Sequence, residues 1–210
     1  ENVKETGAAY RMWYECYDLE GWPTEDDTSF CYAESKDGIH WYKPALGLFE
    51  YQGSHENNIL FRMIGPDGAH SRVHGACVFK DASASADSRY KAVSQGIFKS
   101  LGNQPYRIAG MHSPDGFHWT RYPAPICDIF ADSQYSAFWD TALSSYVLYG
   151  RVEGRGRAIG RSISTRFDTF IPLELVLSAD DNDPPDSDLY NPAALKYPYA
   201  ANAHFMFPSL

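Results

Sequence analysis

Three acidic residues are candidates for acid–base chemistry because of their positions relative to expected strands. Asp132 lies three residues before one expected strand and Asp188 directly before another, and Glu15 lies inside one, in the segment YECYD. Two carboxyl groups on opposite sides of a bond can protonate a leaving group and supply or activate a nucleophile. Each residue also has a structural alternative: a turn cap for Asp132, a solvated loop charge for Asp188, and a structural or rim position for Glu15.

Further residues are candidates for contacting a ligand beside these carboxylates. His74 begins an expected strand and can hydrogen-bond to a hydroxyl group, or else to the backbone as a core histidine. Arg151 can also extend towards a ligand beside the carboxylates. The alternative is a salt bridge to Asp140. The aromatic candidates are Tyr135, Tyr190 and Trp22. Their rings can stack on a sugar face, although an aromatic-rich β protein also needs such rings for packing.

An acidic run offers the only pattern that suggests a metal ion. Asp180-Asp181-Asn182-Asp183 supplies hard oxygen atoms, which calcium prefers. The run lacks the spacing and the glycine of an EF-hand loop, and Pro184-Pro185 stiffens it. We therefore expect a solvated acidic connection and no cofactor, with structural calcium as the less favoured alternative.

The four cysteines show no spacing typical of a metal site. They are Cys16, Cys31, Cys77 and Cys127. Cys16 and Cys31 lie on strands that we expect to be neighbours, so a cross-strand disulfide is conceivable. We favour buried free thiols.

A repeated phrase predicts the architecture that positions these residues. Ser35-Lys36-Asp37-Gly38-Ile39-His40-Trp41 returns as Ser113-Pro114-Asp115-Gly116-Phe117-His118-Trp119, and a weaker copy spans Ser164 to Phe170. Each copy follows an alternating, strand-like run. Ser and Asp side chains can accept hydrogen bonds from backbone N–H groups just ahead, and Gly supplies a positive φ. We therefore predict a tight turn whose closing Trp packs between neighbouring sheets; the alternative is a chance likeness of two ordinary hairpins.

The strand-like runs fall into repeated units of about four. The expected strands are 10–17, 29–34, 42–49, 73–80, 89–96, 106–112, 119–126, 135–139, 146–152, 157–163, 170–177, 189–195 and 203–207. No run predicts a helix. Repeated units of four short strands are typical of a β-propeller, so we expect one all-β propeller domain over residues 1–210.

This propeller is expected to be a partial ring. The blades are expected at about 10–49, 73–127 and 132–177, with the start of a fourth at about 188–210. Propellers close with four or more blades, so roughly three blades leave open edges. We expect the remaining blades to come from flanking chain, or alternatively from another chain.

The order of the strands and of the repeated phrase within each four-stranded unit resembles that of the five-bladed propellers of glycoside hydrolases. These form the invertase, levansucrase and arabinanase superfamily. This order is most similar to that of uncharacterised bacterial proteins described as glycosyl-hydrolase-like. The segments that carry the resemblance are CYAESKDGIHWYKPALGL, HGACVFKD, FWD with YVLYGR, and IGRSIS. The resemblance implies a glycoside hydrolase that cleaves an oligo- or polysaccharide through carboxylates in an axial pocket.

The chain departs from that family's catalytic pattern at two positions. The family's Arg-Asp-Pro-like motif aligns with His74-Gly75-Ala76, so a glycine replaces the expected aspartate, and the family's glutamate falls near Gln134. The first inner strand, which carries the usual nucleophile or base, is absent. The alternative is therefore a non-catalytic propeller that binds carbohydrate or protein.

Charge and hydropathy narrow the range of partners. The chain has 27 acidic and 18 basic residues, a formal net charge of −9, and no Lys/Arg cluster, which argues against nucleic acid or an anionic membrane. No apolar stretch approaches the ~20 residues of a membrane span. The chain begins at Glu1 without a visible secretory signal, so we expect a processed form or a fragment, with secretion or a bacterial periplasmic location plausible. Carbohydrate is the expected partner.

Overall fold

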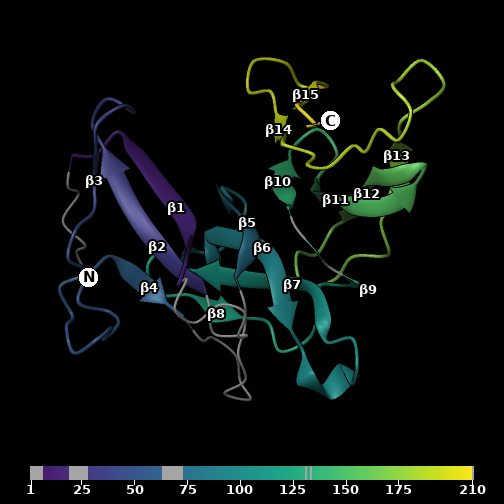
Figure 1. Cartoon of the computed structure of the whole chain (residues 1–210). Coiled ribbons are helices and arrows are strands. Elements are labelled where there is room, and N and C mark those ends of the chain that lie inside the picture. The colour runs from purple at the N-terminus through teal and green to yellow at the C-terminus, as the bar shows by residue number, and fades with distance from the viewer. Residues whose placement is uncertain (1–6, 19–27, 63–72, 131, 133, 210) are drawn as a thin grey trace.

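The protein is an all-β structure built from antiparallel sheets, as the alternating pattern predicts (Figure 1). This computed structural model describes residues 7–18, 28–62, 73–130, 132 and 134–209. Within these residues the strands form three sheets and a C-terminal hairpin, and no sheet closes on itself. The only helical segments described are two short 3₁₀ turns, η1 (Ala86–Ser88) and η2 (Lys99–Leu101).

The strands follow one another in chain order within each sheet. The first sheet contains β1 (Tyr10–Tyr17), β2 (Thr28–Ser35), β3 (Trp41–Tyr42) and β4 (Ile59–Phe61), with β3 and β4 both paired to β2. The second sheet contains β5 (His74–Lys80), β6 (Tyr90–Ile97), β7 (Tyr106–Ser113), β8 (Thr120–Arg121) and β9 (Cys127–Phe130), with β8 and β9 both paired to β7. The third sheet contains β10 (Ser136–Asp140), β11 (Ser145–Gly154), β12 (Gly156–Ser164) and β13 (Glu174–Leu177). The hairpin pairs β14 (Ala194–Lys196) with β15 (His204–Met206).

The repeated phrase forms the predicted turn in both full copies. Ser35 Oγ accepts hydrogen bonds from the N–H groups of Asp37 and Gly38, at 3.2 and 2.9 Å. Asp37 Oδ1 accepts hydrogen bonds from the N–H groups of Ile39 and His40, both at 2.8 Å. The second copy repeats the same bonds, and the two turn glycines, Gly38 and Gly116, have φ of 78° and 84°. The prediction of side-chain acceptors and a positive-φ glycine is confirmed.

Successive sheets pack face to face, each on the next. Trp13 of the first sheet donates its indole N–H to the Gly116 carbonyl of the second, at 2.7 Å. Trp119, which closes the second copy of the phrase, is buried, and its ring centroid lies 6.0 Å from that of Phe30 in the first sheet. The counterpart Trp41 is 37% exposed, so the predicted packing between sheets holds for only one of the two tryptophans.

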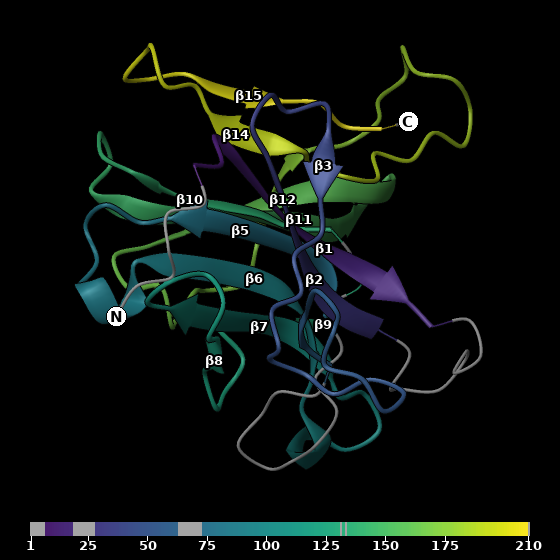
Figure 2. The same ribbon diagram turned by 90° about the vertical axis from the view of Figure 1, so that its left-hand side faces the viewer.

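Among the described residues, three clusters of buried side chains fill the interfaces between neighbouring groups of strands. One lies between the first and second sheets, one between the second and third, and one between the third sheet and the hairpin. Figure 2 shows the hairpin lying over the third sheet. The first strands of the groups are neighbours, because β5 contacts both β1 and β10, and β10 contacts β14. This arrangement places the beginnings of β5, β10 and β14 near one another.

The outer strands are shorter than the sequence predicts. Residues 42–49 and 119–126 were each expected to form one strand, but pairing stops at Tyr42 and Arg121 and resumes on the same partner at Ile59 and Cys127. Pro44, Pro123 and Pro125 lie in the unpaired stretches, and proline has no N–H to donate to a ladder. Pro172 and Pro192 likewise precede the late starts of β13 and β14.

A buried polar cluster attaches the hairpin to the third sheet. Asp140, at the end of β10, accepts a hydrogen bond from Lys196 Nζ at 3.1 Å and lies 2.6 Å from Nε2 of His204. Its side chain is 2% exposed. Burial alone would raise the pKa of Asp140, but the bonds from His204 and Lys196 lower it to about 2. The carboxylate is therefore charged and paired at neutral pH.

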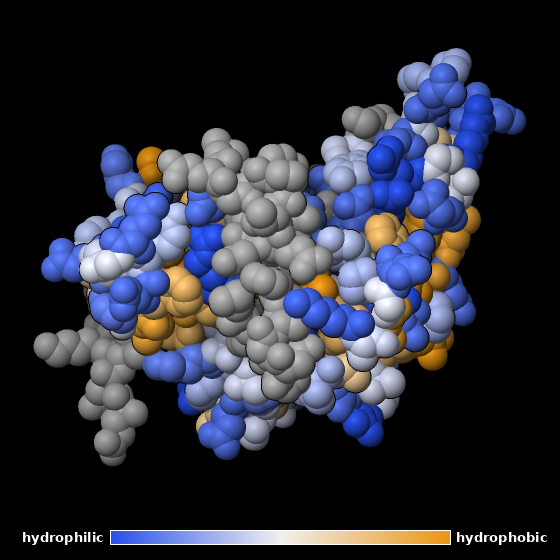
Figure 3. All heavy atoms as spheres, turned by 60° about the horizontal axis from the view of Figure 1, so that its bottom comes forward, coloured by the Kyte–Doolittle hydropathy of each residue, from blue (hydrophilic) through white to orange (hydrophobic). Residues whose placement is uncertain are grey.

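Hydrophilic side chains predominate on the surface seen in Figure 3, with apolar side chains in separate groups. In the described residues, no helix has the length and apolarity that a membrane crossing requires.

We predict that replacing Asp115 by Ala lowers the free energy of unfolding by about 1–2 kcal/mol, because two backbone N–H groups and His118 lose their acceptor. Urea denaturation at pH 7 measures this, with the exposed Asp87→Ala as the control. Equal effects of the two substitutions would contradict the prediction.

The same carboxylate should make stability depend on pH. Partial burial would raise the pKa of Asp115, but the backbone and ring bonds of His118 lower it to about 2. Since this pKa lies below that of an unfolded aspartate, near 3.9, the stabilisation is complete above about pH 4 and is lost as pH falls towards 2. The difference in unfolding free energy between the wild type and Asp115→Ala should therefore shrink over that range.

Candidate functional site

Glu15 and His74 form the first group of the candidate site. Glu15 lies near the end of β1 and His74 at the start of β5, and Nδ1 of the imidazole is 2.9 Å from Glu15 Oε1. The Tyr17 hydroxyl lies 2.7 Å from the same nitrogen. Burial acts to raise the pKa of Glu15, but the bonds from His74 and the Gly75 N–H bring it below its ordinary value. Glu15 is therefore an ionised carboxylate at neutral pH.

Gly75 connects three sheets through its backbone. Its N–H donates to Glu15 Oε2 at 2.8 Å, and its carbonyl accepts from the Tyr135 N–H at 3.2 Å. The pairing of β5 with β6 shifts register between His74 and Cys77, so Gly75 lies in a bulge. Its φ is 64°, in the left-handed region that favours glycine. The bulge thus directs these two backbone groups to the neighbouring sheets.

Asp132 and Arg151 form the second group. Arg151 Nη1 donates to Asp132 Oδ2, and Nη2 donates to Glu153 Oε1 at 3.0 Å. Arg151 lies on β11, and Asp132 precedes β10. A hollow of about 250 Å³ lies beside this pair, lined by Asp132, Arg151, Glu153 and the apolar residues Ile129, Phe130, Val152 and Leu173. The alternative salt bridge of Arg151 to Asp140 is not formed, because Lys196 and His204 pair with Asp140.

Tyr135 is buried and contacts Asp132 through its hydroxyl group. It is 6% exposed, and its hydroxyl donates to the Asp132 carbonyl at 3.2 Å. Burial raises the pKa of this phenol well above its ordinary value. In this structure the Tyr135 ring has no face free for a sugar, so its contact with the Asp132 loop is a packing role.

Asp188, Arg157 and Tyr190 form the third group. The Arg157 N–H donates to Asp188 Oδ1 at 2.7 Å, and its Nη1 donates to Oδ2 at 2.6 Å. The backbone bond, followed by the guanidinium bond, lowers the pKa of Asp188. The Arg157 guanidinium also lies 5.3 Å from the centroid of the Tyr190 ring. Asp188 is therefore an ionised carboxylate held by one arginine.

The second and third groups are adjacent on the third sheet. Glu153, to which Arg151 donates a hydrogen bond, lies opposite Arg157 in the β11–β12 ladder. The first group is joined to them through the Gly75 backbone. The structure therefore brings residues from three sheets and from the segment before β14 to one end of the neighbouring first strands. Trp22 lies outside the described residues.

Sequence reasoning missed three residues of this site: Tyr17, Glu153 and Arg157. The alternation along β11 and β12 identifies both strands, but no sequence signal identifies the carboxylate that each arginine meets. A pattern clue existed for Tyr17 alone, because it follows Glu15 by two residues and so shares a face of the strand.

The remaining expectations concern metal ions and thiols. In the part of the chain that the structure describes, no three His, Cys, Asp or Glu residues are grouped so that they could hold a metal ion. Asp180 accepts the backbone N–H of Asn182 at 2.7 Å, and Asp181 pairs with Arg155. The four cysteines are free thiols, but only Cys31 and Cys127 are buried; Cys77 is half-buried, and Cys16 is exposed, against the expectation of burial. Cys16 pairs with Ser29 across the strands rather than with Cys31, which lies diagonally from it.

No protein-family model matches the chain, and no curated protein matches its sequence. A solved structure with a similar fold is an N-acetylgalactosamine deacetylase from F. plautii in complex with blood group B trisaccharide. The TM-score is 0.59 at 12% sequence identity, over 92% of this chain and 57% of that chain. This chain thus spans little more than half of that protein. A glycosyl hydrolase from Bacteroides ovatus has a TM-score of 0.47 at 14% identity, over 81% of this chain and 50% of that chain.

We predict that Gly156→Ala disrupts the third group. A Cβ at Gly156 would lie 2.3 Å from Asp188 Oδ1, and φ there is 73°. Gly102 has a φ of 71°, and no atom lies within 4 Å of the position of an added Cβ. Gly102→Ala therefore has only the unfavourable backbone conformation, without a steric clash. We expect Gly156→Ala to lower the melting temperature more than Gly102→Ala does. Equal shifts would show that Asp188 is not closely held against this backbone.

Proposed function

We propose that the protein is a carbohydrate-active β-propeller that hydrolyses a glycosidic bond of an oligo- or polysaccharide. The observation that carries the proposal is the convergence of Glu15, Asp132 and Asp188 at one end of adjacent first strands, from three separate parts of the chain. Glycoside hydrolysis requires two carboxyl groups about a bond, and residues from different sheets can approach a bond from different sides.

The packing of the sheets supports the propeller. Each sheet covers one face of the preceding sheet, and their first strands lie side by side, as propeller blades do around an axis. The outer face of the hairpin carries neighbouring aromatic rings that are exposed. They include Tyr199 at 86%, Phe205 at 44% and Phe207 at 65%, with Tyr197 beside them. A further sheet, from the same polypeptide or from another chain, would cover this face and continue the ring.

The lowered pKa values of Glu15 and Asp188 suit the roles of base or nucleophile. Asp132, which lies beside Arg151 and the hollow of about 250 Å³, is the remaining candidate catalytic carboxylate. His74, Arg151 and Tyr190 are the candidate substrate-binding residues, and Trp22 remains a predicted stacking residue. The bound trisaccharide in the F. plautii deacetylase structure supports carbohydrate as the ligand class.

A non-catalytic carbohydrate- or protein-binding propeller is the second candidate. A specific observation favours it: all three carboxylates are already engaged, by His74, Arg151 and Arg157. Gly75 also stands where the resembled family has an aspartate. A binding site can keep its carboxylates paired until ligand hydroxyls replace the partners, whereas a catalytic site needs one of them to hold a proton.

We predict that Asp132→Asn and Asp188→Asn each reduce hydrolysis at least about 100-fold without unfolding the protein. The assay covers fructans, arabinans, aryl glycosides and N-acetylated sugars, the last followed by acetate release. The exposed Asp87→Asn is the control, and circular dichroism checks the fold. Full activity in both variants would overturn these assignments. Sugar binding by the wild type without turnover would overturn hydrolysis in favour of the binding function.

A further inference from the structure

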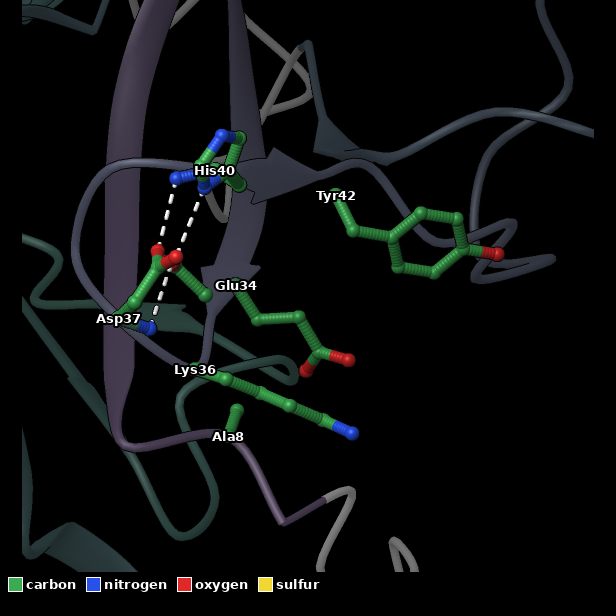
Figure 4. Close-up of a pocket in the computed structure, with 7 residues that line it drawn as sticks. Ala8, Glu34, Lys36, Asp37, His40 and Tyr42 are labelled. Atoms are coloured by element: carbon green, nitrogen blue, oxygen red, sulfur yellow. Dashed lines mark hydrogen bonds and ion pairs between the residues drawn. The ribbon is translucent and has the colours of Figure 1, made fainter.

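A second hollow lies beside the first copy of the repeated turn. It measures about 370 Å³ and is lined by Ala8, Glu34, Ser35, Lys36, Asp37, His40 and Tyr42. In Figure 4 the side chains of Glu34, Lys36 and Tyr42 extend to the same open side. Asp37 and His40 are instead bound to each other, with His40 Nδ1 2.7 Å from Asp37 Oδ2.

This hollow is separate from the candidate active site. Glu15 pairs with Phe30 on β2, and Ser35 is five residues further along that strand. At a strand rise of about 3.4 Å per residue, the two places are roughly 17 Å apart. A ligand in the hollow therefore does not touch the carboxylates of the candidate site.

The second copy of the turn shows which residues the fold itself requires. Both copies make the same Ser and Asp bonds to the backbone and the same His–Asp contact. They differ at three positions that face the hollow. The corresponding residues are Glu34 and His112, Lys36 and Pro114, and Tyr42 and Thr120. Because the second copy forms its turn without a glutamate, lysine or tyrosine there, the turn does not require Glu34, Lys36 or Tyr42.

The three side chains together suit a neutral, polyhydroxylated ligand. Tyr42 is 64% exposed, so its apolar ring face is in contact with water and is available to stack on another ring. Lys36 offers N–H donors, while Glu34 offers carboxylate oxygens, one of them 3.3 Å from the Tyr32 hydroxyl. Glu34 and Lys36 carry opposite charges, and Asp37, the other carboxylate of the lining, is bound to His40. A pyranose ring has an apolar face for the tyrosine and hydroxyl groups at its edge for both partners.

We propose that this hollow is a second carbohydrate-binding site, in which Tyr42 stacks on a sugar ring and Glu34 and Lys36 bind its hydroxyl groups. It would hold a polysaccharide at a distance from the candidate active site. The choice of carbohydrate rests in part on the proposed function, but binding here requires no hydrolysis.

Native gels cast with soluble levan, arabinan or galactan test the proposal, because binding slows migration in proportion to affinity. We expect at least one of the three to retard the wild type, and Tyr42→Ala to weaken that binding about tenfold. Lys36→Pro, which copies the second turn, should weaken it as well. Thr120→Ala, at the matched position of the second copy, should bind like the wild type.

Hydrolysis is measured separately on the same sugars, so this site and the proposed function can fail independently. The proposal is overturned if none of the gels retards the wild type, or if Tyr42→Ala and Lys36→Pro bind unchanged while near-UV circular dichroism shows them folded. Retardation without hydrolysis would overturn only the hydrolase.

Discussion

The candidate site depends on the backbone of one glycine. Gly75 sits in a bulge of β5 with φ of 64°, and its N–H and C=O groups leave the β5–β6 ladder to bond Glu15 and Tyr135. These two bonds connect the first sheet to the third through the second. A residue with a Cβ would be strained there. Gly75 thus forms a backbone junction between the sheets.

Pairing with nitrogen-bearing side chains orients the carboxylates around that junction. His74, Arg151 and Arg157 each engage one of them, and each pair joins residues distant in the sequence. Ion pairing of this kind keeps a carboxylate charged and oriented, which serves a base, a nucleophile or a binding group. It opposes the protonated state that a general acid needs. Whether the site acts as a hydrolase or as a binding site therefore depends on how far a substrate displaces these partners.

The central strands were predictable and the outer ones were not, for a reason visible in the chain. Strands such as β6 and β11 are flanked by partners on both sides, so their apolar residues are continuous or alternate clearly. The outer strands pair on one side only, and prolines next to them interrupt the pairing while the apolar pattern continues. The apolar pattern of residues 119–126 predicts one strand, but β8 ends at Arg121 and β9 begins at Cys127. Apolar alternation predicts which side chains are buried. It does not predict which backbone N–H groups form hydrogen bonds to a neighbouring strand.

The sequence alone determined the repeated Ser-x-Asp-Gly turn, the antiparallel strands that it connects and the candidacy of Asp132, Asp188 and His74. It could do so because those features depend on contacts within a few residues, or on the period of one strand. Only the tertiary structure decided that Arg151 pairs with Asp132 rather than Asp140, that Arg157 holds Asp188, and that Tyr135 is buried. Each of those outcomes depends on which sheet covers which, and the energies that select one partner over another come from burial between segments far apart in the chain.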